Sequence, residues 1–232
     1  MLAQECREPY WMLQESSINR LSTYQLGKEK LDTLESKTLS IILPNSDSIG
    51  VHDFIKEMED RLPVTQIIVS KDTERRGKGW AIRQALNYAQ GEWICFLDSD
   101  GDIPVRMLLR LIPFLEDFDV VVGSKRITHS PMRRKIMTRV TRLWFKFLFG
   151  VKCDTQTGIK LFRRSALDAL NWHWDSNGFI FDVEVISRLQ KKGMRIVEVP
   201  IECEIRRQLA IRTIRIIFLE SLWLKWRLMW SR

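Results

Sequence analysis

Short apolar runs alternate with segments of helical periodicity through the middle of this chain. The runs are rich in β-branched residues and stop at turn formers, which is typical of buried strands, and they cover residues 39–43, 66–69, 93–97 and 120–122. The segments between them predict helices over residues 51–58, 80–89 and 107–115. This alternation predicts an α/β fold with a mostly parallel sheet and helices on both faces. Such sheets bind ligands at the carboxyl ends of their strands, so functional side chains are expected in the loops that follow them.

Two later segments predict amphipathic helices. Within residues 132–149 basic residues, among them Arg133 and Arg134, lie largely away from one apolar face, which is formed by Met132, Ile136, Val140, Leu143 and Phe147. Within residues 206–232 an apolar sector is formed by Ile211, Ile214, Ile217, Phe218, Leu222 and Leu228. On the side of this second helix that carries Arg212 and Arg215 there is a stripe of Trp223, Trp226 and Trp230. Basic amphipathic helices with Trp beside Arg are typical of membrane interfaces; the alternative is a pair of ordinary helices packed on a domain.

Composition and charge narrow the function classes. The chain has 232 residues and a net charge of +8, which favours an anionic partner such as a membrane surface, a phosphorylated substrate or nucleic acid. Nucleic acid is not expected, because no zinc-finger, helix-turn-helix or RNP-like signature is present. Four widely spaced cysteines and the lack of a secretion signal favour a cytoplasmic setting. No apolar run is long enough to span a bilayer, so attachment to the cytoplasmic face of a membrane is expected to be peripheral.

Three acidic residues at alternate positions follow the strand 93–97. Asp98, Asp100 and Asp102 crowd negative charge into a small volume, which is costly unless a cation neutralises it. Carboxylate oxygens suit Mg²⁺ or Mn²⁺, so the triplet is a candidate metal site. The alternative is an acidic turn, because Ile103-Pro104 opens a helix.

Two cationic loops are predicted at the same edge of the sheet. Arg75-Arg-Gly-Lys-Gly79 precedes a helix, where Lys78 and backbone N–H groups are suited to holding phosphate. Gly123-Ser-Lys-Arg126 ends another strand and places Lys125 and Arg126 there. Either loop alone is most simply a basic surface loop. Together with the acidic triplet they predict a site for a metal and a diphosphate.

The order of these and three later motifs resembles the family 2 glycosyltransferases, most closely the branch that makes dolichyl-phosphate or polyprenyl-phosphate mannose and glucose. The later motifs are Asp154-Thr-Gln-Thr-Gly-Ile-Lys-Leu-Phe162, Phe179-Ile-Phe-Asp-Val-Glu184 and Glu198-Val-Pro200. The resemblance covers roughly residues 39–202 and implies a Rossmann-like GT-A fold. It divides the chain into an N-terminal extension (1–37), a catalytic domain (38–205) and an amphipathic, membrane-associated C-terminal helix (206–232).

The resemblance also implies roles for individual residues. On the donor side, Asp98 would contact the nucleotide, Asp100 and Asp102 would hold Mg²⁺ or Mn²⁺, and Asp72 and Pro44 would bind the base or ribose. Lys125 or Arg126 would face phosphate. The acceptor side is implied to comprise Asp154, Gln156, Lys160, Asp182 and Glu184, and Arg133 and Arg134 of the basic helix are also expected to bind the acceptor. The alternatives are a turn for Asp154 and a helix cap for Asp182.

The implied reaction moves a hexose from a nucleotide sugar, such as GDP-mannose or UDP-glucose, to a polyprenyl phosphate with inversion at the anomeric carbon. Two departures from the family pattern matter. The loop Pro44-Asn-Ser-Asp-Ser48 lacks the usual aromatic residue and glutamate, and the chain after Asp72 is shortened by about one helix and one strand. These departures favour weak base selectivity, or a catalytically impaired pseudoenzyme that serves as a binding or scaffold module.

Overall fold

The computed structural model describes residues 38–44, 55–58, 66–98, 100, 102–125, 132–203 and 211–230. At residues 132–135 and 211–214 only the helical backbone is described. The expected N-terminal extension, the loop after Pro44 and Arg126 therefore lie outside the described residues.

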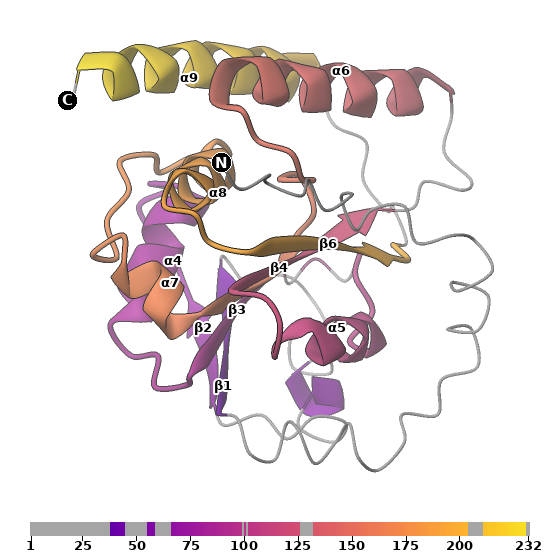
Figure 1. The fold of residues 1–232 in the computed structure, drawn as a ribbon, viewed down its shortest axis with the longest axis vertical. Helices are drawn as coiled ribbons and strands as arrows, with labels where there is room; N and C mark the ends of the chain where they lie inside the picture. Colours follow the sequence, from indigo (N-terminus) through magenta and orange to yellow (C-terminus); the bar gives the residue numbers. More distant parts are fainter. Residues whose placement is uncertain are drawn as a thin grey trace, which may run out of the picture.

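One sheet of six strands forms the centre of the molecule, in the order β2-β1-β3-β5-β4-β6 (Figure 1). The strands are β1 (Leu39–Pro44), β2 (Gln66–Ser70), β3 (Trp93–Leu97), β4 (Val120–Lys125), β5 (Ile159–Arg163) and β6 (Ile196–Ile201). Only β5 runs antiparallel to its neighbours among these strands, so the expected mostly parallel sheet is confirmed. The apolar pattern predicted the first four strands and missed β5, which Lys160 interrupts, and β6, whose exposed and buried positions alternate.

Helices cover both faces of the sheet, as predicted. They are α4 (Lys78–Leu86), α5 (Arg106–Leu111), the 3₁₀ turn η2 (Ile112–Phe114), α6 (Met132–Phe149), α7 (Arg164–Asp168), α8 (Phe181–Lys191) and α9 (Ile211–Trp230). One core joins β-strand side chains such as Phe96 and Phe162 to α4, α7 and α8, and also takes in Phe145 of α6 and Leu224 of α9. A second core on the opposite face joins the sheet to α5 through residues such as Leu108. The helix predicted over 107–115 changes to a 3₁₀ turn at Pro113, which has no N–H to continue the α-helical pattern.

The antiparallel strand β5 matters for the site. The carboxyl end of β3 lies beside the amino end of β5, where the Asp98 N–H donates to the Gly158 carbonyl over 2.8 Å. The loop before β5 therefore reaches the same edge of the sheet as the loops after β1, β2, β3 and β4. Functional side chains were expected only in loops at the carboxyl ends of strands. The loop at the amino end of β5 lies at the same edge and adds its side chains to theirs.

The helices α6 and α9 lie side by side across one end of the molecule (Figure 1). The Trp144 and Phe218 rings pack with centroids 5.0 Å apart, and the Trp144 indole N–H donates to Ser221 Oγ over 2.8 Å. Lys225 Nζ donates to the Leu148 carbonyl, also between these two helices. Within the described residues, no helix combines the length and the apolar character that crossing a bilayer requires.

Candidate active site

A chain of alternating charges forms the centre of the candidate site. Lys78 Nζ, at the first residue of α4, lies 2.7 Å from Asp98 Oδ1 and 3.7 Å from Asp182 Oδ2. Lys160 Nζ, on β5, lies 3.0 Å from Asp182 Oδ1 and also donates to the Thr157 carbonyl. The fold thus brings together four predicted site residues from four separate motifs.

Lys78 and Asp98 stabilise each other's charged forms. Burial alone would raise the pKa of Asp98, but the Lys78 ammonium, supported by Lys160 and Lys125, holds it below its ordinary value. Burial would likewise lower the pKa of Lys78, but Asp98 and Asp182 raise it above its ordinary value. Lys160 is only 1% exposed, so it acts on the site through Asp182 and not by direct contact with an acceptor.

Gly158 of the loop before β5 is required by Asp98. A Cβ at position 158 would lie 2.1 Å from Asp98 Oδ2, so no other residue fits while Asp98 keeps its place. The glycine of the Asp154–Phe162 motif therefore lets the strand loop approach the first aspartate of the acidic triplet closely.

The three aspartates of the acidic triplet differ in their partners and in their exposure to solvent. Asp98 faces Lys78, whereas Asp100 is exposed and Asp102 is largely buried. Burial and the Asp98 and Asp102 carboxylates raise the pKa of Asp100, against an opposing hydrogen bond from the Asp102 N–H. Within the described part of the chain no group of three or more metal-ligating side chains is assembled. The Asp100 and Asp102 carboxylates fit the expected Mg²⁺ or Mn²⁺, because a cation of this kind can be held by one or two carboxylates together with substrate phosphates.

Asp154 organises the loop before β5. Its Oδ1 accepts from the Gln156 N–H over 2.9 Å, and its Oδ2 accepts from Thr157 Oγ1 over 3.0 Å. The Lys125 N–H, at the end of β4, donates to the same Oδ2 over 3.4 Å. Asp154 is 4% exposed whereas Gln156 is exposed, so Gln156 is the residue of this loop that is free to meet a substrate.

A cation from α6 completes this part of the site. Arg142 Nη2 lies 2.7 Å from Glu198 Oε1, 3.2 Å from Ser124 Oγ and 3.5 Å from Asp154 Oδ2. The sequence analysis missed both Arg142 and Glu198 as site residues. Arg142 is one of several basic residues on its helix, and only the fold distinguishes the one that reaches the end of β4.

Both residues expected to bind the base or ribose, Pro44 and Asp72, lie within the described part of the chain. Pro44 ends β1 and is buried beside Ser70 of β2, at the edge of the sheet where the base is expected to bind. Burial would raise the pKa of Asp72, but hydrogen bonds from the Arg76 and Gly77 N–H groups and the Arg76 charge lower it. Asp72 Oδ1 is buried without a hydrogen-bond partner among the described residues, and it is therefore available to a ligand hydroxyl or amine.

Glu184 departs from its expected role in acceptor binding. It is fully buried, and its carboxylate accepts the Asp175 and Ser176 N–H groups and pairs with Arg188. These contacts assign Glu184 to holding the loop before α8. The other expected acceptor residues, Arg133 and Arg134, lie in α6, but their side chains are outside the described part of the structure.

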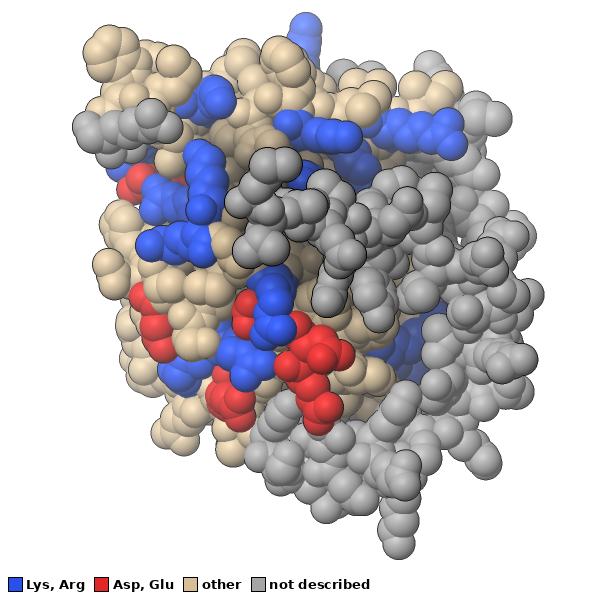
Figure 2. Space-filling model, in the orientation of Figure 1, with Lys and Arg blue, Asp and Glu red and all other residues tan. Residues whose placement is uncertain are grey.

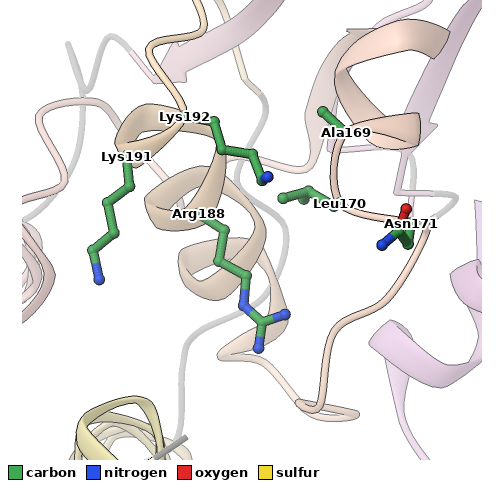
Figure 3. A pocket seen from close by; sticks show the side chains of 6 residues that line it. All are labelled: Ala169, Leu170, Asn171, Arg188, Lys191 and Lys192. Carbon is green, nitrogen blue, oxygen red and sulfur yellow. The ribbon is translucent and has the colours of Figure 1, made fainter. Parts of the chain in front are cut away.

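A separate hollow of about 330 Å³ lies between α7 and α8 (Figure 3). Its lining contains none of the predicted site residues and consists of Ala169, Leu170, Asn171, Arg188, Lys191 and Lys192. Arg188 in this hollow is already paired with Asp175 and Glu184, so the hollow is remote from the chemistry described above.

Comparison with known proteins agrees with this geometry. The model of the family described as Glycosyl transferase family 2 matches residues 31–170. Glycosyltransferase AglD of Haloferax volcanii is 29% identical over 67% of this chain and 26% of its own length. The dolichyl-phosphate beta-glucosyltransferase of Saccharomyces cerevisiae is 29% identical over 61% of this chain and 48% of its own. The chain therefore spans only about a quarter to a half of the length of these relatives.

Solved structures confirm the expected GT-A fold. Glucosyl-3-phosphoglycerate synthase from Mycobacterium tuberculosis, in complex with Mn²⁺, UDP and phosphoglyceric acid, superimposes with a TM-score of 0.66 at 17% identity. The match covers 85% of this chain and 81% of that one. The names of the relatives confirm the resemblance to the polyprenyl-phosphate branch, and the family match covers more than half of the chain. On these grounds, the protein belongs to glycosyl transferase family 2.

Proposed function

We propose that this protein transfers a hexose from a nucleotide sugar, of the GDP-mannose or UDP-glucose type, to a polyprenyl phosphate. One observation carries the proposal. A pair of carboxylates suited to a divalent cation and a pair of cations suited to a phosphate meet at one sheet edge, beneath a helix with an exposed apolar face. The carboxylates are Asp100 and Asp102, and the cations are Lys125 and Arg142.

The donor would bind at the ends of β1, β2 and β3. Asp100 and Asp102 would hold Mg²⁺ or Mn²⁺, which when bound neutralises the diphosphate and makes it a better leaving group. Lys78 adds a positive charge close to the acidic residues, and the free Asp72 Oδ1 offers an acceptor to the ribose or base. Support comes from solved family-fold structures that contain UDP-glucose with Mn²⁺ and UDP with Mg²⁺.

The acceptor phosphate would bind near Lys125 and Arg142. Arg142 is 44% exposed at its side chain despite its contacts with Glu198 and Asp154, so an edge of its guanidinium stays open. Guanidinium groups recognise phosphate oxygens in a bidentate manner. Relatives named undecaprenyl-phosphate mannosyltransferase, from Micrococcus luteus, and polyprenol monophosphomannose synthase, from Mycolicibacterium smegmatis, support a lipid phosphate.

The proposed transfer depends more on aligning the acceptor phosphate with the anomeric carbon of the sugar than on proton transfer. An ionised oxygen of the acceptor phosphate attacks the anomeric carbon and forms the new C–O bond, while the bond to the diphosphate breaks and the nucleoside diphosphate leaves. One such displacement inverts the anomeric configuration. A phosphate oxygen is already ionised at neutral pH, so alignment and charge neutralisation carry most of the catalysis.

The outward sides of α6 and α9 would rest on the cytoplasmic face of a membrane. We call them the outer apolar face, which comprises Ile136, Met137, Val140, Leu143, Phe147, Ile216, Leu219, Leu222, Trp223, Trp226, Met229 and Trp230. These side chains are 38–83% exposed, and Figure 2 shows Lys and Arg beside uncharged side chains along the same two helices. An exposed apolar surface of this extent is unusual on a soluble protein and marks an interaction site. Each basic residue near an anionic bilayer adds about 1 kcal/mol of attraction.

The structure corrects the apolar sector expected for α9. Ile217 is buried, Phe218 packs on Trp144 and Leu228 packs against the core, so these three face the domain. Leu222 and the three tryptophans face outward. One apolar side of the helix therefore packs on the domain, and the exposed side supports the proposed membrane contact.

One transfer assay tests the proposed function. Purified protein is incubated with a panel of labelled nucleotide sugars, a polyprenyl phosphate and Mn²⁺, followed by lipid extraction. Label in the lipid phase with one donor, abolished by chelator, is the expected result. Tight donor binding without transfer to any lipid phosphate would instead support the pseudoenzyme alternative.

A flotation assay tests the membrane part. Wild-type protein should float with anionic vesicles, partly retained at high salt because Trp burial contributes beside charge. Replacing Trp226 and Trp230 by Ser should reduce flotation at high salt most. Wild-type protein that remains at the bottom of the gradient would contradict attachment through this face.

A further inference from the structure

The inward side of α9 contacts the loop that precedes α8. Arg227 Nη2 lies 2.7 Å from Asp175 Oδ1. Burial raises the pKa of Glu220, against an opposing interaction of its carboxylate with the Ile180 N–H. A Cβ at Gly178 would lie 2.6 Å from Glu220 Oε1, and its nearest neighbours would all be atoms of the Glu220 side chain. Two charged residues of α9, seven positions apart, therefore hold both ends of the segment 175–180.

The same loop fixes the start of α4. The Gly79 N–H donates to the Asn177 carbonyl over 2.8 Å, and Arg83 Nη2 donates to Asn177 Oδ1 over 2.5 Å. Gly77 has a φ of +113°, and a Cβ there would lie 2.3 Å from the Asn177 oxygen, so the two backbones touch where only glycine fits. Trp174 Nε1 adds a hydrogen bond to the Gly79 carbonyl over 3.1 Å. Between Gly77 and Gly79 stands Lys78, the cation that faces Asp98 and Asp182.

We propose that α9 is a positioning element for the active site as well as a membrane contact, with Arg227 and Glu220 as positioning residues that act on Lys78 through the loop 175–180. The inference rests on the proposed function, because sugar transfer is one of its measurements. Its physical basis is that catalytic contacts are sensitive to displacements of about 1 Å, which can cost up to about 100-fold in rate. A helix seated on a bilayer would in this way hold the donor-side cation in place.

Asp175 has other charged or polar partners besides Arg227, so Arg227 can be replaced without leaving the Asp175 carboxylate unpaired. Asp175 also accepts from Arg188 Nη2 over 3.2 Å, and His173 Nε2 lies 3.3 Å from it. An Arg227→Gln substitution therefore leaves Asp175 paired within the loop and removes its connection to α9. Within α9 it also removes the stacking of the Arg227 guanidinium on the Trp223 ring. Arg215 is an exposed cation on the same helix, and it forms no ion pair or hydrogen bond within the described part of the chain. The Arg215→Gln variant is therefore a control that removes the same charge.

The first experiment compares Arg227→Gln with Arg215→Gln. Hydrogen exchange is measured for peptides that cover residues 77–82, and transfer is measured with a short, water-soluble polyprenyl phosphate in the absence of membranes. Arg227→Gln should speed exchange at the start of α4 and lower kcat by about tenfold with little change in the acceptor KM, within the range known for misplaced catalytic groups. Arg215→Gln, which removes the same charge from an exposed position of the helix, should change neither. Unchanged exchange and unchanged kcat in Arg227→Gln would overturn the proposal.

A second pair of variants separates positioning from general loss of stability. Gly178→Ala should displace the Glu220 carboxylate and lower kcat, because the new methyl group collides with it. In a Glu220→Ala background, the Gly178→Ala change should have little further effect, since the colliding atoms are gone. Independent, additive effects of the two substitutions would contradict the contact. Hydrogen exchange can be measured whether or not the protein transfers sugar. A wild-type protein without transfer activity would refute the proposed function, and the exchange rates would then decide whether α9 positions the start of α4.

Discussion

Replacing Lys160 by Met should destabilise the protein because it leaves the Asp182 carboxylate short of its nearest partner. Lys160 is 1% exposed, and its Nζ lies 3.0 Å from Asp182 Oδ1. Removing one partner of a buried ion pair costs about 3–5 kcal/mol. Asp182 keeps Lys78 at 3.7 Å, so we expect the lower end, about 3 kcal/mol. In a chain of this size that corresponds to a fall in melting temperature of roughly 6–12 °C.

The double variant Lys160→Met with Asp182→Asn tests whether the cost comes from the uncompensated charge. Removing both charges should restore stability to within about 1 kcal/mol of wild type, because the buried carboxylate is gone. Transfer should not recover with stability, since Lys78 has lost the residue that holds it beside Asp98. Urea unfolding followed by tryptophan fluorescence gives the free energies of unfolding, and the lipid-extraction assay gives the activity. The exposed Lys152 provides the matched control, Lys152→Met, which should change neither measurement. A wild-type midpoint for Lys160→Met, or a double variant as unstable as the sum of the two single variants, would refute this reasoning.

Three further predictions follow from the site. Calorimetry should show weak Mn²⁺ binding to the protein alone and much tighter binding when a nucleoside diphosphate is present, because the described part of the chain assembles no group of three or more metal-ligating side chains. Equal affinity in both cases would contradict a site shared with the diphosphate. Burial and the Asp102, Asp154 and Asp100 carboxylates raise the pKa of the half-buried Cys203 thiol, against the Lys125 charge. Saturating Mn²⁺ should offset these carboxylates, lower that pKa and speed alkylation of Cys203, and an unchanged rate would contradict a cation site in the acidic loop. Cys95 and Cys153 should react only on unfolding, because they are buried and burial raises the pKa of Cys153 to about 12. Arg142→Gln should raise the KM for the lipid phosphate and leave the donor KM unchanged, whereas Lys146→Gln, on the same helix, should change neither KM.

Much of the sheet could be predicted because its strands are buried on both faces. β1 and β3 are buried at every position, so their sequences are continuous apolar runs. β5 was missed because Lys160 lies in its centre, and the compensating Asp182 is supplied by another helix. A charged residue inside a strand argues against that strand until its partner is known, and the partner is distant in the sequence.

The candidate site was predictable where a motif places residues on one loop, as for Asp98, Asp100 and Asp102. Contacts between motifs were not predictable in the same way. The pairing of Lys78 with both Asp98 and Asp182 depends on the packing of α4 against α8. The roles of Glu184 and Arg142 depend on which loop or strand end each meets in three dimensions, and the sequence pattern does not contain that information.

The central claim is that Asp100 and Asp102 support metal-dependent sugar transfer to a lipid phosphate. Its most direct test compares initial rates of transfer for the wild type, Asp100→Asn and a control variant, Asp117→Asn, which removes the same charge from an exposed position elsewhere. We expect Asp100→Asn to lose at least about 100-fold in rate, comparable to the loss of a main electrostatic group in other active sites, with an unchanged melting temperature. Asp117→Asn should retain the wild-type rate. Wild-type turnover in Asp100→Asn would contradict the assignment of the metal site and the mechanism built on it.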